Sequence, residues 1–122
     1  MCGINGILHL QSQRKVDERI LTQMRDALEH RGPDDKGIFI DQNLGLGHRR
    51  WYILEVSAAG HQPFLSEDGR YAMVFNGEIY NYKELKEELK GLGHAFISES
   101  DTEVIINAYK QWGQDCVIHF NG

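Results

Sequence analysis

The 122-residue sequence contains only two cysteines, Cys2 and Cys116, and only two prolines. Two cysteines are too few for a disulfide-stabilised scaffold, and a cytosolic setting would keep both thiols reduced. No apolar run approaches the roughly 18 residues that a membrane span requires. The N-terminus has no basic leader followed by a long apolar stretch, so a secretory signal is not expected. These absences favour a cytoplasmic protein without membrane contact.

Positive charge is not in excess either. The sequence has 13 lysines and arginines against 18 aspartates and glutamates, which gives a net charge of −5. This balance argues against nucleic acid as the main partner. Hydrophobic residues make up 41% and charged residues 25%, close to globular averages, so wholesale disorder is excluded and a folded domain is expected.

Hydrophobic periodicity predicts strands and helices that are interleaved without strict alternation. Strands are expected at 3–10, 37–40, 44–54, 71–75 and 94–97, the fourth of them buried on both faces because its apolar run is unbroken. Helices are expected after the N-caps Asp17, Asn81 and Ser100, the last two with capping boxes to Glu84 and Glu103. Hairpin-like connections favour an α+β architecture with antiparallel strands.

Cys2 is the residue that points most directly to chemistry. Its small side chain allows the initiator Met1 to be removed, which leaves a thiol and a free α-amine on one terminal residue. An α-amine has a reference pKa of about 7.7–8.0. It can therefore take the thiol proton, through a water molecule, without a His or Asp partner. The alternative is a buried cysteine that acts as a small hydrophobe.

Two further segments carry candidate binding groups. In FNGEIYN, residues 75–81, the Asn76 side-chain amide and the Gly77 backbone N–H follow a predicted strand and can supply the two donors of an oxyanion hole. An ordinary Asn-Gly turn is the alternative. In SESDTE, residues 98–103, Asp101 begins a predicted helix, where its charge suits the helix dipole and where it can also bind an ammonium group.

The segment GHRRW, residues 47–51, contains two adjacent arginines. A guanidinium can hold a carboxylate through two hydrogen bonds. Arg49 and Arg50 point to opposite faces of a strand, so only one of them can reach a given site. The alternative is a pair of solvated charges. We expect the arginine that does not bind a ligand to lie on the surface, where its loss costs little.

Six segments occur in order along the chain, namely MCGI, HRGPD, GLGHRR, GHQP, NGEIYNY and SDTEV. Together they resemble the class II glutamine amidotransferase domain, and in particular the domain of glutamine-hydrolysing asparagine synthetases. The resemblance spans residues 1–122. It implies an N-terminal nucleophile fold, an αββα sandwich in which two antiparallel sheets lie between helical layers. The α+β expectation is compatible with this fold.

The resemblance also implies a reaction, the hydrolysis of glutamine to glutamate and ammonia. Cys2 matches the nucleophile of the family, and Asn76 and Gly77 match its oxyanion hole. Arg31, in HRGPD, resembles a structural arginine near the site.

Five further residues match the groups that bind glutamine in the family. Arg50, immediately before an apolar residue, matches the arginine that binds the substrate carboxylate. Glu78 and Asp101 match the groups around its α-ammonium. The backbone around Ile53 and Leu54 would line the pocket.

Three departures from the family pattern leave the ammonia acceptor open. Trp51-Tyr52, Glu55 and Phe64 stand where Leu-Ser, Asp and Met are common. The resemblance implies aspartate as the acceptor, with another carboxylate, such as a sugar acid in polysaccharide biosynthesis, as the alternative.

The matching segment ends early compared with the family domain, which predicts a truncated fold and a synthetase domain as partner. No phosphate-binding loop is present, so ATP and Mg²⁺ are expected only in that synthetase domain and no cofactor in this chain. Cys116 and His119 have the spacing of half a metal site, but no second ligand pair matches it, and no metal is expected.

Two rival functions stay open beside the amidotransferase. One is an N-terminal nucleophile hydrolase acting on another amide, which Arg50 and Asp101 disfavour because together they match a free amino acid. The other is an inactive fragment that binds glutamine or a partner. Self-association into a homo-oligomer is compatible with all three.

Overall fold

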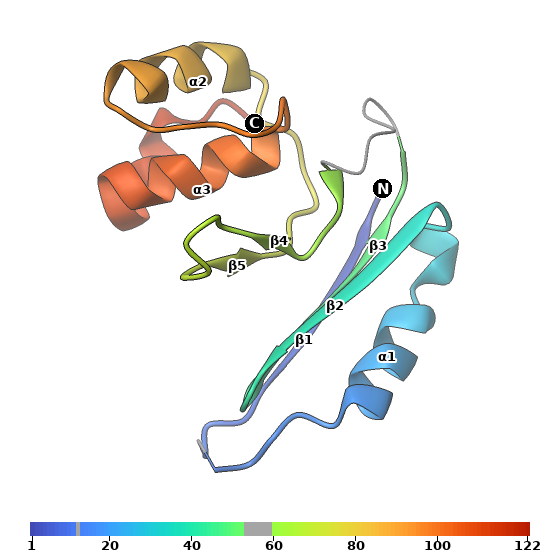
Figure 1. Cartoon of the computed structure of the whole chain (residues 1–122). Helices are drawn as coiled ribbons and strands as arrows, with labels where there is room; N and C mark the ends of the chain where they lie inside the picture. Colours follow the sequence, from blue (N-terminus) through green and yellow to red (C-terminus); the bar gives the residue numbers. More distant parts are fainter. Residues whose placement is uncertain (12, 53–59) are drawn as a thin grey trace. The chain divides into compact units, whose positions relative to one another are not determined.

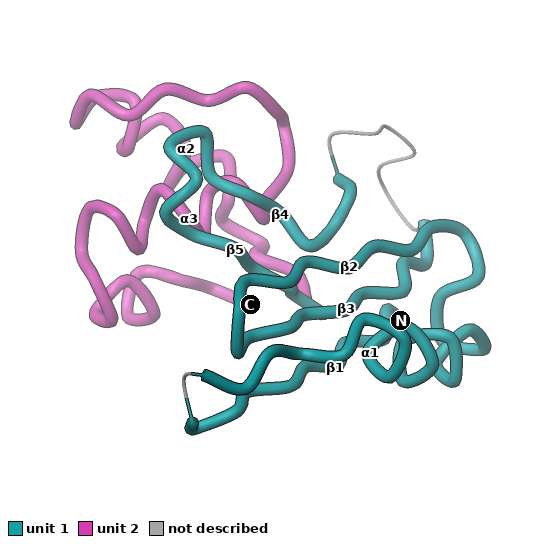
Figure 2. Tube along the Cα trace, turned by 60° about the horizontal axis from the view of Figure 1, so that its bottom comes forward, with its two compact units in different colours: residues 1–76 teal, residues 77–122 magenta. Residues whose placement is uncertain are grey.

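The computed structural model describes residues 1–11, 13–52 and 60–122. The chain divides into two compact units, Met1–Asn76 and Gly77–Gly122, which Figure 2 shows in different colours. All strands lie in the first unit and the two longest helices lie in the second.

The first unit is built on a three-stranded antiparallel sheet (Figure 1). Its strands are β1 (Gly3–Leu8), β2 (Asp35–Asp41) and β3 (Leu44–Arg50), in the order β1-β3-β2. Residues 42–43 join β2 to β3 as a tight hairpin, in which Gln42 adopts a positive φ of 51°. The predicted antiparallel pairing is confirmed.

Helix α1 (Glu18–Asp26) covers one face of this sheet. Its predicted N-cap is confirmed, because the Asp17 side chain accepts hydrogen bonds from the backbone N–H groups of Arg19 and Ile20. Leu21 of α1 is fully buried. A Cβ atom at Gly45 of β3 would come within 2.9 Å of the Leu21 side chain, so the glycine lets the helix approach the strand closely.

The short strands β4 (Phe64–Leu65) and β5 (Ala72–Met73) form a separate two-stranded antiparallel sheet. The prediction of a strand over 71–75 buried on both faces is wrong. Only two of these residues are in a strand, and all five are half-buried. Within the described part of the chain, β4 is the one hydrogen-bonded neighbour of β5, so β5 has no second pairing there of the kind a central strand would have.

The second unit consists of α2 (Tyr82–Gly91), α3 (Asp101–Trp112) and the 3₁₀ helix η3 (Gly113–His119). Its core contains apolar side chains from α2 and α3, namely Leu85, Leu89, Val104, Ile106 and Ala108. Among the described residues, no helix combines the length and the apolar character needed to cross a membrane.

The strand predicted at 94–97 is wrong, because these residues form an irregular connection. The backbone N–H of Ile97 and that of Ser98 donate to the Glu103 carboxylate at 2.8 Å and 2.7 Å. Ser100 caps α3 as predicted, since its hydroxyl accepts from the Glu103 N–H. Glu103 thus binds the preceding loop and does not close a capping box. Its carboxylate accepts hydrogen bonds from the backbone N–H groups that a neighbouring strand would otherwise have paired.

Candidate active site

Cys2 lies immediately before β1 and is half-buried, whereas Met1 is 67% exposed. Its thiol is free. The Cys2 carbonyl accepts a hydrogen bond of 3.3 Å from Nε of Arg31. The exposed Met1 is therefore accessible to removal, while the backbone of Cys2 is fixed by the arginine that the sequence predicted to be structural.

The sheet register ends with the pair Gly3 and Arg49, so Cys2 and Arg50 are the next residues along the two chains. Continued by one position, this antiparallel register would set Cys2 opposite Arg50, and directly paired Cα atoms lie about 5 Å apart. Gly3 faces Leu28 and Arg49 faces α1. Because strand residues alternate, Cys2 and Arg50 belong to the opposite face of the sheet.

Arg50 is buried, with 8% of its surface exposed, which excludes the solvated-charge alternative. Its guanidinium lies 4.8 Å from the centroid of the Tyr52 ring. It also lies directly against Gly60, where a Cβ atom would overlap it. The first residue of GHQP is thus a glycine because the guanidinium occupies the space of a side chain.

Arg49 is buried on the other face, where its Nη2 atom lies 2.7 Å from the Asp26 carboxylate and 3.9 Å from that of Glu29. The two arginines therefore point to opposite faces, as predicted. The expectation that the second one is a surface residue is wrong. Arg49 connects β3 to the end of α1, because Asp26, the last residue of that helix, places its carboxylate beside the guanidinium.

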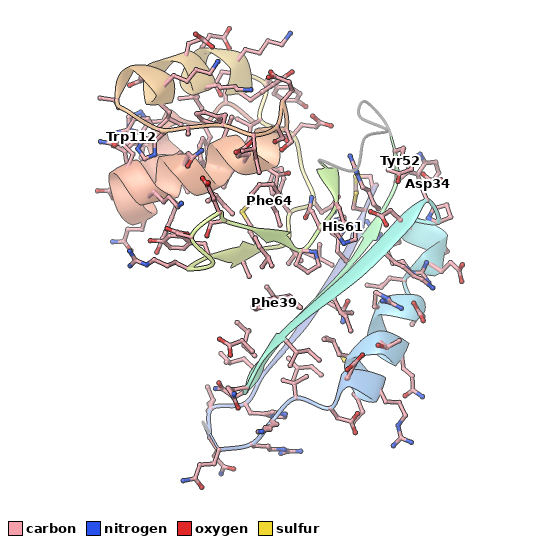
Figure 3. All side chains as sticks on the ribbon, in the orientation of Figure 1. Asp34, Phe39, Tyr52, His61, Phe64 and Trp112 are labelled. Carbon is pink, nitrogen blue, oxygen red and sulfur yellow. The ribbon has the colours of Figure 1, made fainter. Side chains whose placement is uncertain are left out.

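The segments HRGPD and GHQP anchor the chain around these strands, a role that the sequence did not reveal. Asp34 accepts a hydrogen bond of 2.8 Å from the Tyr52 backbone N–H, and His61 Nδ1 lies 2.8 Å from the Asp35 carboxylate (Figure 3). Gln62 accepts a bond of 2.6 Å from the N–H of Phe75. The two motifs themselves were the sequence signal for this role. The residues that they bind are distant in sequence, so the contacts could not be predicted from the motifs.

Gln62 thereby fixes the backbone directly before Asn76. Asn76 itself is exposed and ends the first unit, and Gly77, also exposed, begins the second. The predicted pocket residues Ile53 and Leu54 lie outside the described residues.

His48 is a buried polar residue that the sequence analysis did not single out. It is completely inaccessible, and neither ring nitrogen has a hydrogen-bond partner among the described residues. Burial lowers the pKa of His48 from 6.5 to about 4, and the Phe75 backbone offsets only part of this effect. The imidazole is therefore neutral at pH 7, on the same sheet face as Arg50.

In the second unit, the structure brings Glu78 and Asp101 together. Loss of hydration, and then the neighbouring Asp101 charge, raise the pKa of Glu78. Asp101 is the first residue of α3, and its carboxylate accepts a bond of 3.1 Å from the Ile79 N–H. Two carboxylates that repel one another provide a place where a cation would be favoured.

Cys116 and His119 belong to no group of three or more potential metal ligands among the described residues. The His119 ring stacks on Trp112, with centroids 3.9 Å apart and planes 9° from parallel; Figure 3 labels Trp112 at the end of α3. Cys116 is buried, and loss of hydration raises the pKa of its thiol.

The family described as "Glutamine amidotransferase domain" matches residues 1–122. The chain is 41% identical over 124 residues to "Asparagine synthetase [glutamine-hydrolyzing] 1" of Bacillus subtilis (strain 168), covering 100% of this chain and 20% of the relative.

Two other relatives show the same pattern. "Putative asparagine synthetase [glutamine-hydrolyzing] 2" of Methanocaldococcus jannaschii is 42% identical over 140 residues, with 100% of this chain and 26% of the relative covered. "Amidase chry2" of Gibberella zeae is 36% identical over 134 residues, with coverages of 100% and 20%. The chain thus spans between a fifth and about a quarter of these relatives' lengths. By its full-length match, the chain belongs to the glutamine amidotransferase domain family.

Proposed function

We propose that residues 1–122 hydrolyse the side-chain amide of glutamine to glutamate and ammonia, with Cys2 as the nucleophile. The observation that carries the proposal is the register of β1 against β3, in which Gly3 pairs with Arg49. This pairing supports a site in which a potential nucleophile and a carboxylate-binding guanidinium share one end and one face of the sheet.

In the first half of the reaction, removal of Met1 converts the Cys2 nitrogen from an amide into an amine. The amine takes the thiol proton, and the thiolate attacks the amide carbon of glutamine. Asn76 Nδ2 and the Gly77 N–H donate to the oxygen that becomes negative. The protonated amine then gives its proton to the departing nitrogen, which leaves as ammonia while a γ-glutamyl thioester forms on Cys2.

In the second half, the Cys2 amine removes a proton from water, which attacks the thioester carbon. The same donors stabilise the second oxyanion. When the carbon–sulfur bond breaks, Cys2 leaves as a thiolate and regains its proton from the amine, and glutamate is released. One group therefore acts as base and acid in turn.

Recognition of a free amino acid requires groups of both charges. Arg50 would hold the α-carboxylate through paired hydrogen bonds. Glu78 and Asp101 would bind the α-ammonium, which their mutual repulsion favours. The backbone around Ile53 and Leu54 completes the pocket in this proposal.

The family match also supports the finer fold proposal, an N-terminal nucleophile αββα sandwich. The antiparallel sheet with α1 on one face provides one sheet and one helical layer of such an arrangement. A reduced Cys2 thiol is required, so we place the reaction in the cytoplasm.

For the whole protein, we propose that the ammonia amidates aspartate in an ATP- and Mg²⁺-dependent synthetase domain. The names of the Bacillus and Methanocaldococcus relatives support this acceptor. A second candidate is transfer to a different carboxylate, such as a sugar acid, which the departures at Trp51-Tyr52, Glu55 and Phe64 leave open. Product analysis with glutamine, ATP and each candidate acceptor distinguishes the two.

Processing of the N-terminus tests the glutaminase proposal. Preparations with different fractions of retained Met1, measured by intact mass, are assayed for glutamate release. The rate should be proportional to the fraction that lacks Met1. Full activity in chains that retain Met1 would exclude the Cys2 amine as the base.

A further inference from the structure

We propose that Asn81 is a positioning residue of this site. It ties the tail, residues 119–122, onto residues 78–80, and so fixes the segment that carries Glu78. The inference rests on the proposed function, because it assigns Asn81 a part in glutamine use.

Three hydrogen bonds join the tail to this segment. Asn81 Nδ2 donates to the His119 carbonyl at 2.9 Å, and Asn81 Oδ1 accepts from the Asn121 N–H at 2.9 Å. The Tyr80 N–H donates to the Asn121 carbonyl at 2.7 Å. Both functions of one amide side chain are therefore used to hold the tail.

Packing against Glu78, a proposed substrate-binding residue, adds to these hydrogen bonds. Gly122 lies directly against the Glu78 carbonyl, where a Cβ atom would overlap the oxygen. On the other side, the Ile79 N–H is bound by Asp101. Residues 78–80 are thus held between the start of α3 and the tail.

Asn81 stands at a helix N-cap, but its side chain binds the tail and not the helix. It stands at the N-cap of α2, where its sequence pattern predicts a side-chain cap, yet it makes no capping hydrogen bond. The predicted capping box with Glu84 is therefore wrong, and the physical reason is that both amide atoms are engaged by the tail. A side-chain amide suits this position because it carries a donor and an acceptor on two separate atoms, which can bind two backbone groups at once.

Loosening the tail should affect binding of glutamine more than the reactivity of Cys2. Glu78 is adjacent to the tethered residues and is proposed to bind the α-ammonium, a contact made in the ground state as in the transition state. Loss of such uniform binding raises KM with little change in kcat. Two neutral hydrogen bonds correspond to at most a roughly five- to 150-fold rise in KM.

The test compares variants of the full chain. Asn81→Ala removes both bonds, Asn81→Asp keeps the acceptor and removes the donor, and Gly122→Ala pushes against Glu78. Asn107→Ala is the matched control, because it removes a buried amide that donates to the Ala95 carbonyl in the same unit. Gly91→Ala controls for the added methyl, since a Cβ atom there meets nothing within 4 Å.

The readouts are glutamine KM and kcat, alkylation of Cys2 by iodoacetamide, and hydrogen exchange of the Tyr80 amide. Asn81→Ala should raise KM and speed Tyr80 exchange, with kcat and alkylation unchanged, and Asn81→Asp should lie between it and wild type. Gly122→Ala should also raise KM, and both controls should leave it unchanged.

An unchanged Tyr80 exchange rate in Asn81→Ala, or an equal KM rise in Asn107→Ala, would overturn the inference. Failure of the proposed function looks different: Cys2→Ala would then release glutamate as fast as wild type. The exchange experiment needs no enzymatic activity, so the tether is tested in either case.

Discussion

Arg49 and Arg50 are adjacent in sequence, but β3 sends them to opposite faces and gives them different partners. Arg50→Ala should raise glutamine KM by about ten- to a hundredfold, because a charge-assisted carboxylate contact contributes about 1.5–3 kcal/mol. Arg49→Ala should instead lower the melting temperature by several degrees, because the variant removes a buried guanidinium that packs against α1 and pairs with the partly exposed Asp26.

Steady-state kinetics and thermal unfolding of both variants check this division. Arg50→Lys serves as a control that keeps the charge and loses the paired hydrogen bonds. A larger KM rise in Arg49→Ala than in Arg50→Ala would show that the face assigned to the substrate is wrong.

His48 makes stability depend on pH. Its folded-state pKa of about 4 lies below the ordinary 6.5, so between these values the unfolded chain binds the extra proton. Its contribution to stability is complete above about pH 6.5 and is lost as the pH falls toward 4. By linkage, this residue alone should lower the free energy of unfolding by about 2 kcal/mol between pH 7 and pH 5.

Urea unfolding of wild type and His48→Gln at both pH values isolates this contribution. Between pH 7 and pH 5, the free energy of unfolding should fall by about 2 kcal/mol less in the variant than in wild type. All other titrating groups are the same in the two proteins. Identical pH dependence in the two proteins would mean that His48 is protonated in the folded state.

At the scale of elements, α1 is held on the sheet by the face that carries Leu21. Leu21→Ala should reduce the free energy of unfolding by about 2–5 kcal/mol, since it removes a fully buried side chain from the contact with β3. Ile20→Ala on the same helix is the control, because Ile20 is 47% exposed and its truncation should cost about 0.5 kcal/mol. Equal losses in urea unfolding would contradict the assigned face.

The elements that the sequence predicted well have strong local signals. Asp17 caps α1 and Ser100 caps α3, and the sequence pattern of β2 and β3 predicted their antiparallel hairpin. The errors lie where a distant partner decides. Residues 72–73 pair with β4 and, among the residues that the structure describes, with no second strand. The N–H groups at 97 and 98 bind a glutamate from α3.

For the site, the motifs identified the candidate residues but not their supports. Periodicity gave the opposite directions of Arg49 and Arg50, yet not the burial of either. The two partners of Asn81, His119 and Asn121, lie 38 and 40 residues away in sequence. The space beside Gly60 is filled by the Arg50 guanidinium. Such contacts depend on tertiary structure, which a local pattern does not contain.

At the scale of the whole molecule, the described candidates divide equally between the two units. Cys2, Arg50 and Asn76 belong to the first, and the second contains Gly77, Glu78 and Asp101. The chain spans between a fifth and about a quarter of the relatives that it matches. The glutaminase step is therefore the part of the account that this chain can test by itself.

The most direct test is the fate of glutamine with wild type and Cys2→Ala, measured by glutamate release and by intact mass after rapid acid quenching. Wild type lacking Met1 should release glutamate and carry a γ-glutamyl adduct that maps to Cys2. Cys2→Ala should show neither, while its urea unfolding stays close to that of wild type. Glutamate release by Cys2→Ala at the wild-type rate, or an adduct on another residue, would contradict the account.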